Sequence, residues 1–171
     1  MRILFLFLLL NFSLINNILS QQKTVIDYYT YCNARYGYCI KYPAGLTPQP
    51  EAQNGDGRIF TNKKGIEVLR VYGARYDDFE TGRYIPLLRH FSSELRGGRF
   101  KDHLKREIIY SKSGKDFFVI SGTENGKIFY QKVIEQRTDT DTTVAVAFLQ
   151  YTETEKVFYN EVAKMIFTSF K

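Results

Sequence analysis

Apolar and polar residues alternate through much of the chain, with the two-residue period that is typical of half-buried β-strands. Seven segments show this alternation or a continuous apolar run, and we predict strands at 37–42, 58–62, 66–73, 104–110, 116–121, 127–136 and 142–151. Residues 144–149 include no polar position, which indicates a central strand covered on both faces. Turn sequences separate neighbouring strands, and the strongest of them, Asn125-Gly126, predicts an antiparallel hairpin.

Two other segments have the spacing of amphipathic helices. The first is predicted at 79–96, with an expected buried stripe of Ile85, Leu88, Phe91, Ser92 and Leu95. Pro86 is its weak point, since an interior proline costs about 3 kcal/mol, and regular helix can begin as late as Ile85. The second follows Thr152 and Glu155, which fit a capping box, and its expected stripe is Val157, Phe158, Val162, Met165 and Ile166.

The order of three strands, a helix, four strands and a second helix predicts an α+β fold. Both faces of the long strands carry apolar residues, so we expect one antiparallel sheet of about seven strands, covered by helices on both faces. The composition is that of a single globular domain, since 44% of the 171 residues are apolar and 25% are charged, with only 12 Gly and 4 Pro. These values exclude collagen-like, disordered and disulfide-dense chains.

The first twenty residues have the layout of a secretory signal peptide. Arg2 precedes an apolar run at 3–10, and a mixed tail ends at Ser20. Asparagines interrupt the run well before the roughly 18 apolar residues that a membrane helix needs. We therefore predict a signal peptide at 1–20, a single α+β domain at 21–171 without a transmembrane span, and export to the periplasm or the cell exterior.

Cys32 and Cys39 are the only cysteines, and an oxidising compartment would permit a bridge between them. A straight strand would hold their Cα atoms about 23 Å apart, whereas a disulfide needs about 5 to 6 Å. A bridge therefore requires a chain reversal, which residues 33–37 can supply because Asn and Gly tolerate turn conformations. The sequence leaves a disulfide and two free thiols equally open.

Basic residues concentrate at 83–106, whereas the chain as a whole has 24 basic and 18 acidic residues. The candidate partner-binding residues are Arg89, Arg96, Arg99, Lys101, Lys105 and Arg106. Such a surface would attract an anionic partner, either a protein or an anionic component of the cell envelope. The alternative is a solvated helix face whose cations suit the helix C-terminus. Nucleic acid is not expected for an exported chain without a binding motif.

No catalytic, cofactor or metal site is predicted. His90 and His103 are the only histidines, and no nucleophile-elbow or zinc motif accompanies them. We expect His90 on the surface of the first helix. The loops at 54–57 and 138–142 carry too few carboxylates to complete a calcium shell, so turns are the favoured interpretation.

Several short motifs resemble the Mog1/PsbP-like fold. They are Asn33-Ala34-Arg35-Tyr36-Gly37-Tyr38 leading to Tyr42-Pro43, Asn54-Gly55-Asp56-Gly57-Arg58, Ser121-Gly122, Ile128-Phe129-Tyr130-x-Lys132, and Ser169-Phe170. Together they are similar to small exported bacterial proteins of unknown function that share this fold. The resemblance implies an antiparallel sheet with helices on its faces, and a noncatalytic role in binding or assembly. No site residue transfers with it.

The resulting hypothesis is an exported, noncatalytic binding or assembly protein that uses a basic surface at 83–106. Two alternatives make different structural predictions. A small hydrolase-type enzyme would place His90 or His103 in a pocket beside a carboxylate or hydroxyl group. A structural, envelope-associated protein would scatter the cations of 83–106 over opposite faces.

Overall fold

The computed structural model describes residues 25–97 and 105–171, so the predicted signal peptide lies outside the described residues. The strands before the first helix are β1 (Tyr28–Cys32), β2 (Cys39–Pro43), β3 (Thr47–Pro48), β4 (Gly57–Thr61) and β5 (Glu67–Ala74). Helix α1 (Leu87–Leu95) is followed by β6 (Arg106–Ser113), β7 (Phe117–Glu124), β8 (Lys127–Arg137) and β9 (Thr142–Tyr151). A 3₁₀ turn (Glu153–Glu155) then leads into α2 (Lys156–Ser169).

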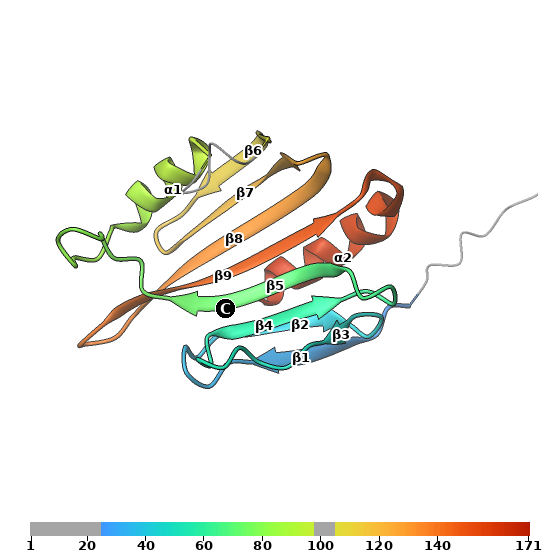
Figure 1. Cartoon of the computed structure of the whole chain (residues 1–171), viewed down its shortest axis with the longest axis horizontal. Helices are drawn as coiled ribbons and strands as arrows, with labels where there is room; N and C mark the ends of the chain where they lie inside the picture. Colours follow the sequence, from blue (N-terminus) through green and yellow to red (C-terminus); the bar gives the residue numbers. More distant parts are fainter. Residues whose placement is uncertain (1–24, 98–104) are drawn as a thin grey trace, which may run out of the picture.

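Seven of these strands form one antiparallel sheet, in the spatial order β3-β4-β5-β9-β8-β7-β6 (Figure 1). The apolar strand β9 occupies the centre, between β5 and β8, as its sequence predicts. Asn125 and Gly126, both with positive φ, form the tight turn between β7 and β8. The α+β class and the antiparallel sheet are therefore confirmed.

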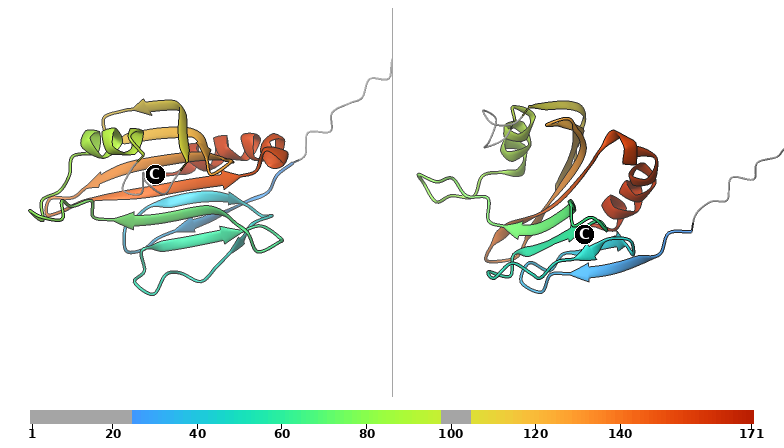
Figure 2. Two further views of the ribbon diagram at one scale, coloured as in Figure 1. Left: turned by 45° about the horizontal axis from the view of Figure 1, so that its top comes forward. Right: turned by 45° about the vertical axis from the view of Figure 1, so that its right-hand side comes forward.

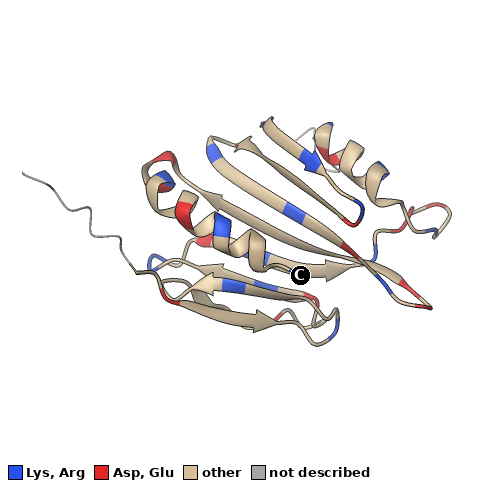
Figure 3. Ribbon diagram, turned by 180° about the vertical axis from the view of Figure 1, so that it is seen from behind, with Lys and Arg blue, Asp and Glu red and all other residues tan. Residues whose placement is uncertain are grey.

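The sheet separates two apolar cores. On β9, Ala145, Ala147 and Leu149 point toward the core that holds α2 and the β1–β2 ribbon, while Val144 and Val146 point toward α1. The helices consequently lie on opposite faces of the sheet, as predicted (Figure 2). Seen from behind, α2 runs along one face with the ribbon beside it (Figure 3). Helix α1 is shorter, and it covers only the part of its face around β6 and β7.

Strands β1 and β3 were not predicted, and the predicted first strand, β2, lies outside the seven-stranded sheet. The expected first strand corresponds to β2, which pairs with β1 in a separate two-stranded ribbon rather than in the main sheet. Strand β1 has the sequence Tyr-Tyr-Thr-Tyr-Cys, which lacks a clear apolar–polar alternation. Strand β3 is only two residues long and contains Pro48, as suits a short edge strand.

Helix α1 begins at Leu87, eight residues later than the predicted start at Phe79. The preceding segment forms a turn instead, closed by a β-bridge between Asp77 and Tyr84. Asp78 accepts hydrogen bonds from the backbone and the hydroxyl of Thr81, at 2.9 and 2.8 Å, so it caps this turn and not the helix. Pro86 immediately precedes α1, where its missing N–H costs nothing.

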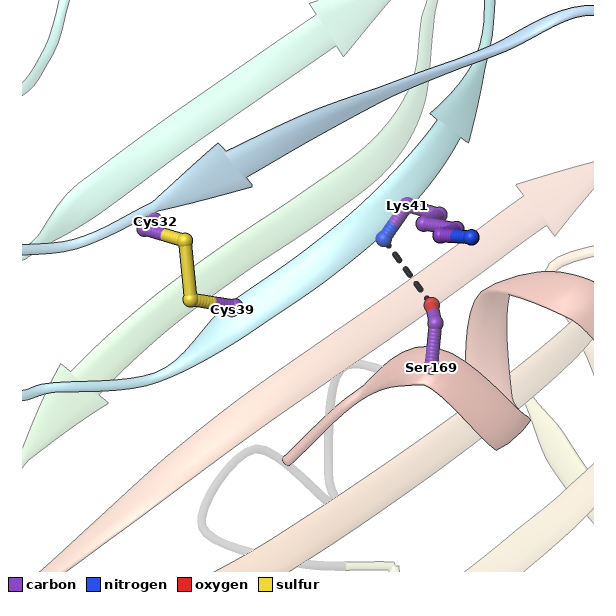
Figure 4. The surroundings of a disulfide bond; sticks show 4 residues. All are labelled: Cys32, Cys39, Lys41 and Ser169. Atoms are coloured by element: carbon purple, nitrogen blue, oxygen red, sulfur yellow. Dashed lines mark hydrogen bonds between the residues drawn. A yellow bond between two sulfur atoms is a disulfide. The ribbon is translucent and has the colours of Figure 1, made fainter.

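A disulfide joins Cys32 to Cys39 across the end of the β1–β2 ribbon (Figure 4). The intervening residues reverse the chain, and Gly37 adopts a positive φ of 69° there. The C-terminus pairs with the same ribbon, because the amide of Cys39 donates to the carbonyl of Lys171 at 2.8 Å. The amide of Lys41 donates to the hydroxyl of Ser169 at 2.9 Å. The C-terminus is thereby held against β2.

Candidate functional site

The outward face of α1 combines apolar and basic side chains. Leu88 is 68% exposed and Leu95 is 40% exposed, although both belong to the stripe that was predicted to be buried. Arg89 and Arg96 are also exposed. Leu88 and Leu95 are spaced by seven residues, or about two helical turns, so they lie on one face of the helix, with Arg89 on the adjoining face. Arg96 follows directly as the C-cap residue of α1.

The inward face of α1 only partly matches the predicted stripe, since it keeps Phe91 but not Leu88 and Leu95. Leu87 and His90 are buried there, and Phe91 packs against the same core. The prediction that His90 lies on the surface is therefore wrong. In the inward stripe, Glu94 is paired with Arg106 of β6, which a solvent-facing orientation would not provide. Nδ1 of His90 is buried and has no hydrogen-bond partner among the described residues.

Glu94 belongs to this inward stripe and joins a buried ionic cluster. Arg106 of β6 contacts Glu94 at 2.9 Å, and its Nε donates to Glu124 of β7 at 2.6 Å. The guanidinium also lies over the ring of Phe129, 4.8 Å from its centroid. Burial by itself would raise the pKa of Glu94, but His90 and Arg106 outweigh it and hold the pKa below its ordinary value. The cluster thus joins α1 to two strands.

His90 meets only part of the requirement for a hydrolase site. Its Nε2 lies 3.7 Å from a carboxylate oxygen of Glu94. However, the ring is stacked on Tyr76, with centroids 3.6 Å apart, and the residue is only 4% exposed. His90 lines neither of the two hollows described below. The ring is therefore held in packing between α1 and the sheet, and His103 lies outside the described residues.

The candidate partner-binding residues have different positions. Arg89 and Arg96 are exposed on α1, and Lys105 is exposed just before β6. Arg106, in contrast, is only 8% exposed and is occupied by Glu94 and Glu124, so it belongs to the internal cluster and not to an accessible surface. Arg99 and Lys101 lie outside the described residues. The basic surface that can be assigned is consequently Arg89, Arg96 and Lys105.

Some of the other lysines and arginines are already paired with carboxylates. Lys and Arg positions and Asp and Glu positions are both spread along the chain in Figure 3. Arg35, Arg70, Arg75, Arg137 and Lys156 form ion pairs. Arg89 and Arg96 form no ion pair with any described carboxylate, so their charges remain available.

A second surface feature escaped sequence reasoning. Two adjoining open hollows, of about 350 and 300 Å³, lie between the β4–β5 turn and the start of α2, and both are lined by Asn62 and Lys64. Phe158 lines the larger hollow and is 44% exposed, although it was predicted to face the sheet. The buried stripe of α2 consists of Tyr159, Val162, Ala163 and Ile166, so Val162 and Ile166 are buried as predicted. A sequence signal was present, since Phe158-Tyr159 offers two aromatic residues of which one helix face can bury only one.

The loops considered for metal binding are turns where the structure describes them. Asp56 pairs with Arg35 at 2.9 Å, and the side chain of Asn54 donates to the same carboxylate. Within the described ranges no group of three or more His, Cys, Asp and Glu side chains is placed to hold a metal ion. Among the described helices none is long and apolar enough to cross a membrane.

These features define an α+β protein in which one antiparallel sheet separates two helices. The chain has the Mog1/PsbP-like fold. It is similar to cyanobacterial PsbP (CyanoP) from Synechocystis sp. PCC 6803, with a TM-score of 0.58 and 12% identity over 88% of this chain and 95% of that chain. It is also similar to the Ran-binding protein Mog1p of Saccharomyces cerevisiae, with a TM-score of 0.51 and 10% identity over 86% of this chain and 96% of that chain.

No protein-family model and no curated protein sequence matches the chain. At identities of 12% and 10%, the likeness to the two solved structures establishes the fold alone. The surface of α1 therefore has to be interpreted from its own chemistry.

Proposed function

We propose that this chain is an exported, noncatalytic binding or assembly protein, and that the outward face of α1 binds an acidic surface of a protein partner. The observation that carries the proposal is the exposure of Leu88 and Leu95 beside Arg89 and Arg96, neither of which forms an ion pair with a carboxylate in the described part of the chain. The fold is compatible with such a role, since Mog1p, which shares it, is a Ran-binding protein.

A protein partner would cover the exposed leucines of α1 and would supply carboxylates to its arginines. Covering an exposed leucine completely contributes about 1.5 to 3 kcal/mol, and α1 offers two leucines one above the other. Arginine forms bidentate hydrogen bonds with carboxylates, so Arg89 and Arg96 would favour an acidic partner and would speed its encounter with α1. An apolar centre with cations beside it is the arrangement that many protein interfaces use.

A noncatalytic role fits the position of the polar groups. The residues that could take part in acid–base chemistry, His90 and Glu94, are packed between α1 and the sheet and are engaged with Tyr76 and Arg106. A substrate would have to displace this packing to reach them. We therefore infer that the cluster stabilises the position of α1, and that α1 in turn presents the binding surface.

Export is proposed from the amino-terminal sequence and is compatible with the disulfide between Cys32 and Cys39, because such bonds persist in oxidising compartments. Fractionation of the producing cells, followed by N-terminal sequencing, checks the proposal. We expect a periplasmic or extracellular protein that starts at Gln21. An intact Met1 on a protein retained in the cytoplasm would contradict it.

The binding proposal is tested by capture of proteins from a cell-envelope extract of the producing organism. We expect the variant Arg89→Glu/Arg96→Glu to lose about 90% or more of the captured partner, because two favourable charges become repulsive. The matched control is Lys112→Glu/Lys115→Glu, which makes the same charge change at two exposed residues, one near the end of β6 and one in the β6–β7 turn. Both variants should keep the parent melting temperature, since all four residues are exposed.

Two outcomes would overturn the α1 surface as the binding site. One is unchanged capture by Arg89→Glu/Arg96→Glu, and the other is an equal loss in the Lys112/Lys115 control. Recovery of anionic lipid without a protein, lost in the same α1 variant, would retain the basic surface but would reject a protein as its partner.

A further inference from the structure

The two adjoining hollows form one groove, with an apolar end and an end of mixed polar and apolar lining. The larger hollow is lined by Pro43, Gly45, Leu46, Asn62, Lys63, Lys64, Phe158 and Tyr159. The smaller one continues past Asn62 and Lys64 along the β9–α2 junction, where Gln150, Thr152 and Thr154 line it. The groove lies on the α2 side of the molecule, at the β4–β5 turn, and involves no residue of α1.

The apolar end of the groove has a well-packed floor. Leu46 and Tyr159 are each only 5% exposed, and both belong to the main core, so they form a fixed floor. Phe158 stands beside Tyr159 with its ring edge-on and centroids 5.0 Å apart. A volume of about 350 Å³ is at the small end of ligand sites, and it suits one aromatic or branched aliphatic side chain.

The rim of the groove carries a positive excess. Lys63 and Lys64 are exposed at the β4–β5 turn, and neither forms an ion pair with a described carboxylate. Lys127 lines the smaller hollow together with Glu155. The Glu155 carboxylate is already occupied by the backbone amide and the hydroxyl of Thr152, at 3.1 and 2.7 Å. Glu155 attracts Lys64 and Lys127, and Glu67, which also lines the smaller hollow, is paired with Arg70 at 2.8 Å. An anionic group entering the groove would therefore meet three lysines against two carboxylates, with Lys63 on the side away from the smaller hollow.

We propose that this groove binds an extended segment of a protein partner, with one apolar side chain in the larger hollow and carboxylates beside Lys63 and Lys64. The smaller hollow has a mixed lining, in which Ile66, Val68 and Tyr151 accompany Gln150, Thr152 and Thr154. This mixture favours a peptide over a lipid, because an acyl chain would meet polar groups where it needs apolar surface. A peptide can use these groups as hydrogen-bond partners. The site is separate from the proposed α1 surface and does not depend on it.

The proposal is tested with synthetic fluorescein-labelled peptides that carry Phe, Leu or Trp followed by four aspartates. Their binding to the mature chain is measured by fluorescence anisotropy at low and high salt. We expect saturable binding by at least one peptide, weakened by salt, and about tenfold weaker binding by the variant Lys63→Glu/Lys64→Glu. Phe158→Ala should weaken binding by about three- to tenfold, because the larger hollow loses a wall.

Controls separate the groove from nonspecific attraction. The variant Lys112→Glu/Lys115→Glu has the same net charge as Lys63→Glu/Lys64→Glu, and it should bind the peptides like the parent. A peptide in which serine replaces the apolar residue should bind at least about tenfold more weakly. The α1 variant Arg89→Glu/Arg96→Glu should leave peptide binding unchanged, so a failure here is distinguishable from a failure of the proposed function.

Three results would overturn the proposal. The first is no binding of any of the three peptides at millimolar concentration, and the second is equal weakening in both lysine variants. The third is binding of phosphatidylglycerol vesicles that requires Lys63 and Lys64 while the peptides do not bind, which would assign the groove to a lipid surface. Melting curves of each variant establish that it is folded, and the exposure of Lys63, Lys64 and Phe158 makes this outcome expected.

Discussion

At the scale of single residues, Glu94 shows how a charged side chain can determine the orientation of a helix. Its carboxylate meets Arg106 at 2.9 Å in a region that is largely shielded from water. A buried arginine without partners would be expensive, whereas Arg106 has two carboxylates and an aromatic face. The stripe of α1 that contains Glu94 therefore faces the sheet, and Leu88 and Leu95 remain exposed on the other side of the helix.

The free energy of unfolding should depend on pH partly through the ion pair between Glu94 and Arg106. The pKa of Glu94 is lower in the folded chain than its ordinary value of 4.5. Its contribution is therefore fully present above pH 4.5 and is lost as the pH falls through the folded pKa, because the unfolded chain then binds more protons. We expect Glu94→Gln to lower the free energy of unfolding at pH 7 by about 1 to 3 kcal/mol and to flatten its decline in acid.

Urea unfolding between pH 3 and 7 measures both effects. Glu107→Gln is the matched control, since it removes the same charge from an exposed position next to Arg106 and should change neither quantity. Parallel acid profiles for the parent and Glu94→Gln would contradict the assignment of Glu94 to the cluster.

At the scale of elements, the β1–β2 ribbon is stabilised from two sides. The disulfide closes a loop with a sequence separation of 7, and the C-terminal residues pair with Cys39 and Lys41. Tyr31 and Tyr42 of the ribbon pack on Phe60, with ring centroids 5.9 and 4.5 Å apart. The ribbon is thus a covering layer on the α2 side of the sheet, not an extension of the sheet.

Removing the disulfide should weaken this layer without dissolving the sheet. A loop of this length constrains the unfolded chain by about 2 to 3 kcal/mol, so we expect Cys32→Ser/Cys39→Ser to lose roughly that amount of stability. Denaturant unfolding gives the loss, and hydrogen exchange locates it. Faster exchange should be confined to the amides of β1 and β2, and uniform acceleration through β7 to β9 would contradict a local role.

At the scale of the whole molecule, the C-terminus connects the ribbon, α2 and the sheet. Phe170 is only 1% exposed, and its ring meets that of Tyr38 edge-on with centroids 5.8 Å apart. Lys132 of β8 donates to the carbonyls of Phe167 and Phe170, at 2.8 and 3.0 Å. A cation at the C-terminal end of α2 also suits the helix dipole. The β1–β2 ribbon, α2 and β8 therefore meet around Phe170.

Truncating this side chain should destabilise the entire fold. Removing a buried phenylalanine leaves a cavity and costs about 3 to 5 kcal/mol, so we expect Phe170→Ala to lose stability in that range as one cooperative transition. Phe79→Ala is the control, because Phe79 is fully exposed and should cost almost nothing. The midpoint of guanidinium unfolding measures the difference. Equal midpoints for Phe170→Ala and the parent would contradict the role of the C-terminus.

The sequence by itself determined the features that depend on local pattern. The boundaries of β9 match the prediction from Thr142 to Tyr151, because no polar residue interrupts its centre. The Asn125-Gly126 pair predicted the β7–β8 turn, because both residues tolerate the positive φ that this turn needs, whatever the rest of the chain does. Thr152 and Glu155 form the predicted capping box, which again involves only residues close in sequence. The fold class followed from the order of these elements.

Only the tertiary structure decided which face of each helix is buried. Phe91, Val162 and Ile166 face the cores as predicted, whereas the other buried positions depended on distant partners. These partners are Arg106 for α1 and, for α2, the aromatic packing of Tyr151 against Tyr159, with centroids 5.1 Å apart. The same holds for the bridge between Cys32 and Cys39 and for the groove beside Phe158. Each arises from residues far apart in the chain or from a chain reversal, and hydrophobic periodicity contains no information about such contacts.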